Sequence, residues 1–181
     1  DTNQDTIFFA KTVYASISDY NISKLSFDLE SVDIEEGFIH IQRDKEGVFN
    51  HQFLKDYFAS TKKKKKKSPK ITVANVSLSD TRFKYDDYRK VARTSGVDYF
   101  HIDTRDIDGE INNFKIEKGV YSADINSFNF IEKSGFVLKD LITNAAVSHD
   151  GVFLRDLILT SKSSSIEAEK FDMLSTGLED F

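Results

Sequence analysis

The 181-residue sequence contains no cysteine, no tryptophan and a single proline. The absence of cysteine excludes disulfide bonds, thiolate metal sites and cysteine nucleophiles, and it is compatible with an oxidising compartment such as the bacterial periplasm. The common catalytic signatures are missing too: the sequence has no G-x-S-x-G, no P-loop, no G-x-G-x-x-G and no H-E-x-x-H motif. We therefore expect a protein that is not an enzyme, with no catalytic residues and no cofactor.

Long apolar runs are also missing, so no segment is long enough to cross a bilayer as a helix, and the start does not resemble a signal peptide. The chain begins at Asp1 without an initiating methionine. We expect it to be a piece of a larger protein, with any membrane anchor outside residues 1–181. The formal net charge of -5 argues against a nucleic-acid partner, because such binding depends on a basic face.

What the sequence does have is alternation of apolar and polar residues with a period of two, which is typical of strands with one buried face. Leu25, Phe27 and Leu29 alternate with polar residues, and the pattern becomes almost unbroken in the C-terminal two thirds. Helical periodicity is scarce. We predict a mainly β fold, an antiparallel sheet with one apolar face, and one short helix.

Polar segments containing glycine separate these runs, and glycine tolerates the positive φ that tight turns require. We predict chain reversals at residues 35–37, 44–47, 108–109, 117–119, 132–135 and 149–151. At Asp108-Gly109 a bulge inside a strand is an equal alternative.

One segment departs from the β pattern. Apolar residues at helical spacing predict a short amphipathic helix near residues 51–60, and the lysine run Lys62–Lys67 with Pro69 predicts a solvated linker over 62–70. Contact of the lysines with anionic lipid head groups is the alternative. We therefore divide the chain into an N-terminal β unit (1–61), the linker, a β meander (71–170) and an irregular end (171–181).

The polar residues offer little for catalysis or metal binding. The four histidines show no pair at metal-ligand spacing, so we expect no metal site. The calcium-like stretch 104–109 would place Lys115 at the twelfth position of an EF-hand loop, where a bidentate carboxylate is needed. A carbohydrate-active β-helix enzyme using Asp103, Asp106 and Asp108 is a third, weaker hypothesis.

The apolar face must be covered, because a soluble monomer usually exposes a contiguous apolar patch of only a few hundred Å². Two solutions fit the pattern. The sheet closes on itself as a structural or adhesive sandwich or solenoid, or it curls into an open trough whose lining meets hydrocarbon. Periodicity does not choose between them.

A family resemblance favours the trough, that is, an elongated, curled antiparallel sheet that forms an open groove. The stretch Gly37 to Asn50, with its R-D-x-x-G turn and aromatic-Asn pair, resembles the N-terminal unit of the AsmA/TamB family, especially TamB-like proteins of Bacteroidota. Residues 5–11 resemble the opening strand of that family, 73–87 its next strand pair, and 127–141 a later one.

The resemblance implies a periplasmic protein, anchored in the inner membrane of a Gram-negative bacterium, whose β-taco carries phospholipid and supports outer-membrane biogenesis. It implies contacts with the inner membrane and with a BamA/TamA-type barrel through parts outside residues 1–181. The side chains expected to contact acyl chains are Ile39, Ile41, Ile71, Val73, Phe83, Tyr85, Ile107, Ile111, Phe114, Ile116, Ile125, Phe128, Phe130, Phe136, Leu138, Val152, Leu154, Leu157 and Leu159.

Overall fold

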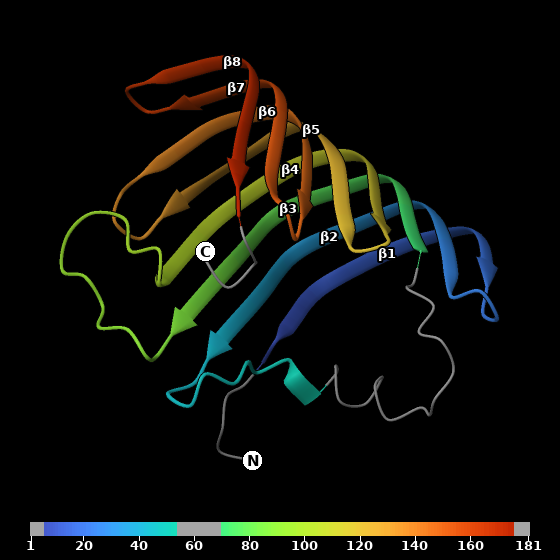
Figure 1. The fold of residues 1–181 in the computed structure, drawn as a ribbon, viewed down its shortest axis with the longest axis horizontal. Coiled ribbons are helices and arrows are strands. Elements are labelled where there is room, and N and C mark those ends of the chain that lie inside the picture. The colour runs from blue at the N-terminus through green and yellow to red at the C-terminus, as the bar shows by residue number, and fades with distance from the viewer. Residues whose placement is uncertain (1–5, 54–69, 176–181) are drawn as a thin grey trace.

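The computed structural model describes residues 6–53 and 70–175, and these residues form one sheet of eight strands (Figure 1). The strands are β1 (Phe8–Asn21), β2 (Ser26–Arg43), β3 (Lys70–Asp87), β4 (His101–Glu117), β5 (Val120–Glu132), β6 (Val137–Ser148), β7 (Gly151–Ser161) and β8 (Ser165–Leu174). They lie side by side in chain order, and β1 and β8 form the two edges. The prediction of a mainly β, curled and open sheet is confirmed.

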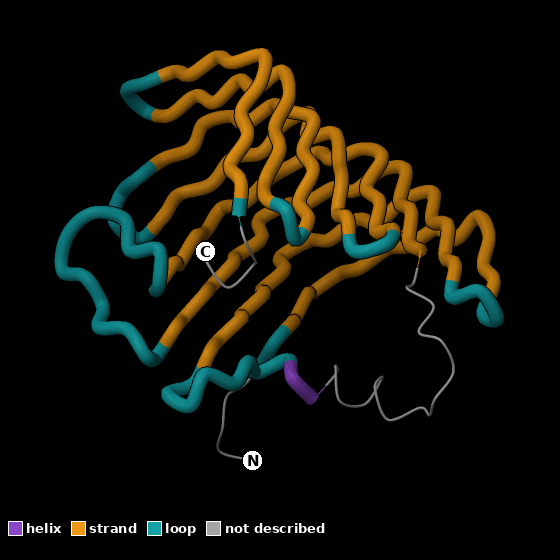
Figure 2. Tube along the Cα trace, viewed as in Figure 1, coloured by secondary structure: helices purple, strands orange, loops and turns teal. Residues whose placement is uncertain are grey.

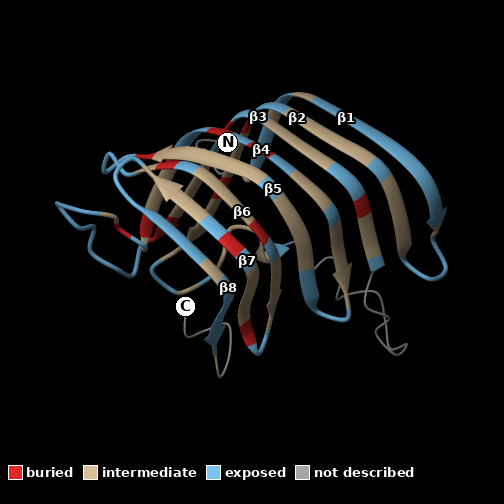
Figure 3. Ribbon diagram, turned by 90° about the horizontal axis from the view of Figure 1, so that it is seen from above, coloured by how far each residue is buried: buried red, intermediate tan, exposed pale blue. Residues whose placement is uncertain are grey.

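The sheet is a single bent layer. Figures 1 and 3 show the strands arching over a common crest, so that the sheet has the shape of a half-pipe. Among the described residues no second layer packs on it, and only four apolar side chains are buried: Val73, Ile107, Leu138 and Leu157. A sandwich or filled barrel would bury an entire apolar face, so the closed alternative is not the fold observed.

Tight turns join the antiparallel neighbours from β3 onward, apart from the longer β3–β4 loop. The β4–β5 hairpin turns through Lys118 and Gly119, with φ of 53° and 80°. Positive φ at both central positions defines the type I′ turn, whose twist matches that of the flanking strands. The turns at 132–135 and 149–151 also fall where glycine predicts them.

The predicted reversal at residues 35–37 is wrong, because β2 continues through it as far as Arg43. Glu36 instead adopts a positive φ of 48° inside the strand. Gly109 likewise lies inside β4, as the bulge alternative proposed. A local signal for positive φ does not distinguish a bulge within a strand from a turn between two strands.

The sheet is not purely antiparallel, and this corrects a second prediction. β2 and β3 pair in parallel from Ser26↔Lys70 to Arg43↔Asp87. A parallel pair needs a long crossover connection, and the stretch of chain between Arg43, at the end of β2, and Lys70, at the start of β3, is long enough to provide one. The parallel pair joins β1–β2 and β3–β8 into one sheet.

Part of the predicted chain organisation falls on residues that are not described. Gln52 and Phe53 are helical (Figure 2), whereas the remainder of the predicted helix, 54–60, and the linker up to Pro69 lie outside the described residues. β8 extends to Leu174, into the predicted irregular end. Over residues 6–53 and 70–175 no helix is long and apolar enough to cross a membrane.

Candidate functional site

The candidate site is the apolar face of the half-pipe, built from rows of cross-strand partners whose side chains share a face. One row crosses the whole sheet through Tyr20, Phe27, Ile71, Ile116, Tyr121, Val147, Val152 and Met173. The next contains Ile17, Leu29, Val73 and Phe114 on β1–β4 and Ala123, Ala145, Leu154 and Phe171 on β5–β8. We call the face that carries these rows the apolar trough.

Two further rows continue the trough along the strands. They contain Ala15, Val32, Val76, Ile111, Ile125 and Thr143, and then Val13, Ile34, Leu78, Gly109 and Phe128. Strict alternation would place Ile111 on the opposite face from Phe114, three positions away. Asn113, between them, has a positive φ of 52° that reverses the alternation in β4. Because Val76 pairs with Ile111 and Val73 with Phe114, the reversal extends to β3.

A second line of reversals crosses β2, β3 and β4 at Glu36, Asp80 and Asp106, with φ of 48°, 47° and 53°. Distances between residues on the two sides of this line show that the alternation is reversed there. A Cβ added at Gly37 would lie 2.8 Å from Ile34 Cγ2 and 3.0 Å from Thr81 Oγ1, so all three positions share a face. The apolar rows therefore stay on one side of the sheet along β2, β3 and β4.

The trough lies on the concave side of the sheet. Bending a sheet crowds the side chains on its concave face and spreads those on its convex face, so the less exposed face is the concave one. Ile107 is 4% exposed, whereas its neighbours Asp106 and Asp108 are both exposed. On β7, Leu157 is likewise buried, whereas its neighbours Asp156 and Ile158 are exposed.

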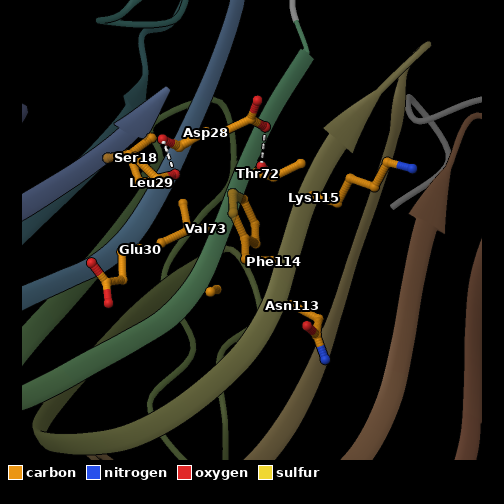
Figure 4. A pocket seen from close by; sticks show the side chains of 10 residues that line it. Ser18, Asp28, Leu29, Glu30, Thr72, Val73, Asn113, Phe114 and Lys115 are labelled. Carbon is orange, nitrogen blue, oxygen red and sulfur yellow. Dashed lines mark hydrogen bonds between the residues drawn. The ribbon is translucent and has the colours of Figure 1, made fainter. Parts of the chain in front are cut away.

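At the bend the surface is hollowed (Figure 4). A cavity of about 480 Å³ is lined by residues 28–30, 72–74 and 113–115 together with Ser18. Each triplet is centred on a member of one apolar row, namely Leu29, Val73 or Phe114. Thr72 donates a hydrogen bond to Asp28, whose backbone carbonyl accepts one from Ser18 Oγ at 2.9 Å.

The structure brings the predicted lipid-contacting side chains together. All of those in strands belong to the concave face by register, and the ring of Phe136, in the turn before β6, lies 6.2 Å from that of Phe130. The prediction left out other members of the same rows: Phe27, Leu29, Val32, Ile34, Val76, Leu78, Tyr121, Ala123, Leu141, Ala145 and Val147. Asp or Asn within an alternating run is the signal that could have located the reversals.

The three acidic residues of the enzyme hypothesis have separate surroundings in the structure. Asp103 is held by Arg82, whose Nε and Nη2 donate at 2.9 and 2.7 Å. Asp108 accepts a hydrogen bond from the backbone N–H of Asp80 at 3.0 Å, and Asp106 occupies a bulge. Over the described residues no group of three or more His, Asp or Glu side chains is placed to hold a metal ion.

A buried polar cluster lies at one end of β2, β3 and β4, around Asp86. Its carboxylate faces His40 Nε2 at 2.9 Å, His101 Nδ1 at 3.3 Å and Lys84 Nζ at 2.8 Å. Burial raises the pKa of Asp86, but the hydrogen bonds from Lys84, His40 and His101 outweigh it, so the pKa is lowered. Asp86 therefore stays ionised and ties three strands together on the face opposite the trough.

Next to Asp86 on β3 lies Asp87, which follows Tyr85, the partner of Ile41, by two residues on the trough face. Its carboxylate accepts hydrogen bonds from Arg89 Nε and Nη2 at 2.8 and 2.6 Å. These bonds lower the pKa of Asp87 to about 2, against the opposing effect of burial. Burial in turn raises the pKa of the Tyr85 phenol, which therefore stays neutral at the end of the trough.

Fold and site together define an open, single-layer β-sheet protein with an apolar concave face. Comparisons of the chain with protein-family models, curated proteins and solved structures gave no match.

Proposed function

We propose that the apolar trough binds phospholipid acyl chains and conducts them between the inner and outer membranes, as a segment of a periplasmic AsmA/TamB-like protein anchored in the inner membrane. One observation carries the proposal: apolar rows cross the concave face from β1 to β8, and no other described element covers them. The quoted similarity of residues 37–50 to that family supports it.

The free energy of burying an acyl chain in the trough is compatible with movement of that chain along it. Burying one CH₂ group stabilises by about 0.8 kcal/mol, so a sixteen-carbon chain gains about 12 kcal/mol on leaving water. A closed pocket would hold such a chain in one position. A trough lined by similar apolar rows on successive strands offers nearly equal energies at neighbouring positions, so a bound chain can move along it.

Site-specific photo-crosslinking tests the proposal. A photoreactive amino acid at Phe83, Phe114 or Phe130, on the concave face, is expected to crosslink to phospholipid, with the adduct identified by mass spectrometry. The matched control is Arg105, whose side chain is 66% exposed and lies next to the Asp106 bulge. Absence of lipid adducts at all three positions in folded protein, or equal labelling at Arg105, would exclude the trough as the lipid site.

The second candidate is a structural or adhesive β module that carries no lipid. Its closed form disagrees with the open sheet. In its open form, partner protein rather than lipid would cover the trough. Binding of a hydrophobic fluorescent dye, and its displacement by phospholipid but not by soluble head-group analogues, separates the two functions.

A further inference from the structure

We propose that the β3–β4 loop, residues 88–100, docks the protein onto the surface of an anionic lipid bilayer. The loop projects beyond the ends of β3 and β4, at the left of Figure 1 and again in Figure 3. It continues from Tyr85 and Asp87, at one lip of the trough. The inference concerns attachment to a membrane surface and does not depend on lipid lying in the trough.

The outward charge of the loop is positive. Lys90 and Arg93 are exposed, whereas the guanidinium of Arg89 forms an ion pair with the buried Asp87. The carboxylates of the segment, Asp87 and Asp98, are 2% and 1% exposed. In the neighbouring turn, Lys45 and Glu46 are both exposed and offset each other. Basic side chains next to a membrane are attracted to the negative surface of anionic lipids, and here no exposed carboxylate of the loop opposes that attraction.

The same loop presents apolar and aromatic side chains to solvent. Val91 is 94% exposed and Tyr99 67% exposed, and Tyr88 is also exposed. A valine side chain exposed to water buries no apolar surface. Tyrosine is enriched at the boundary between the lipid head groups and the acyl chains of a membrane. Protein segments that lie in this boundary combine exposed apolar side chains with flanking basic residues. The apolar side chains distinguish this loop from a surface that is only positively charged.

Internal hydrogen bonds fix the shape of the loop. The Asp98 carboxylate accepts bonds from the backbone N–H groups of Arg93 and Phe100 at 2.7 and 3.1 Å. At the base of the loop, His101 Nε2 donates to the carbonyl of Lys90 at 3.0 Å. The buried Asp98 carboxylate thus organises the backbone of the loop, and the cations of Lys90 and Arg93 are left at the surface.

Vesicle co-sedimentation tests the proposal. The protein is expected to bind vesicles containing phosphatidylglycerol and to bind vesicles of phosphatidylcholine alone much more weakly, with binding reduced by salt. The double variant Val91→Asp, Arg93→Glu changes two exposed side chains and is expected to weaken binding to the anionic vesicles at least about tenfold, since each basic residue near the surface contributes about a factor of five.

The matched controls make comparable substitutions at exposed positions outside the β3–β4 loop. Ile22→Asp alters an apolar side chain that is 70% exposed in the β1–β2 turn, and Arg105→Glu reverses an exposed charge on β4. Both controls are expected to retain binding. Equal binding to both kinds of vesicle, unchanged binding by the double variant, or an equal loss in the controls would each overturn the proposal.

A second measurement uses intrinsic fluorescence, because the chain has no tryptophan. Val91→Trp is expected to shift its emission to the blue on addition of phosphatidylglycerol vesicles, and Ile22→Trp is expected not to shift. No shift for Val91→Trp, or an equal shift for both, contradicts docking through the loop. Lipid crosslinking in the trough is expected to be the same in all of these variants, so failure of docking is distinguishable from failure of the proposed lipid-binding function.

Discussion

At the scale of single residues, the trough depends on a few backbone conformations. Asp80, Asp106, Asn113 and Asp156 have positive φ within strands. Asp and Asn adopt this conformation more readily than other side chains that carry a Cβ, because their short polar groups bond locally. Each reverses the alternation once, which returns the following apolar residues to the concave face.

Asp87 is predicted to make stability dependent on pH. Its pKa is about 2 in the folded protein, below the ordinary value of 3.8. A lowered pKa stabilises the folded state above the ordinary value, and that stabilisation is lost as pH falls through about 4 towards about 2. We expect the free energy of unfolding, measured by urea denaturation, to decline over this range.

Asp87→Asn is expected to lower the free energy of unfolding at neutral pH by about 1–3 kcal/mol, because Arg89 loses its charged partner. It should also reduce the acid-induced decline. Part of the decline should persist, since the pKa values of Asp86 and Asp98 are also lowered. An unchanged dependence on pH in this variant would contradict the assignment.

Gly151 is predicted to be indispensable for the pairing of β7 with β8. It has a φ of 142°, and an added Cβ would lie 2.1 Å from the carbonyl oxygen of Met173. Gly151→Ala must separate the two strands, and we expect it to cost at least about 2 kcal/mol in urea denaturation. The control Gly119→Ala also has a positive φ, of 80°, but meets nothing within 4 Å, so it should cost about 1 kcal/mol. Equal costs would contradict the steric explanation.

At the scale of elements, the two edge strands differ in how they are protected. β8 carries Glu167, Glu169, Lys170 and Asp172, and charged side chains on an edge oppose pairing with other molecules. β1, over its fourteen residues, carries only two charged side chains, Lys11 and Asp19. The β1 edge is therefore the part of the described sheet that is most open to further strand pairing.

Tyr14→Lys is expected to reduce self-association of the isolated protein, because a charge on an unpaired edge disfavours the addition of another strand. Light scattering as a function of protein concentration measures the effect. Val120→Lys, at an exposed position in a strand paired on both sides, serves as the control and should leave association unchanged. Greater association of Tyr14→Lys, or an equal decrease in the control, would show that the β1 edge is not responsible.

At the scale of the whole molecule, the described residues form a half-pipe whose concave face is apolar and whose convex face carries most of the charged side chains. At one lip of the trough, the polar cluster around Asp86 links β2, β3 and β4. The proposed membrane-docking loop continues from the same lip. The proposed lipid trough and the proposed membrane contact therefore adjoin, which is the arrangement that exchange of lipid with a bilayer would need.

Alternation in the sequence is enough to predict that the chain is mainly β and which apolar residues share a face within each short run, because a period of two is a local property. The sequence also located the turns at Gly119, Gly135 and Gly151. It did not distinguish the positive φ of Glu36 within a strand from that of a turn, since both require the same local conformation. The parallel pairing of β2 with β3, the persistence of one apolar face across the reversals and the open edges were decided only by the tertiary structure, because they depend on partners far apart in the chain.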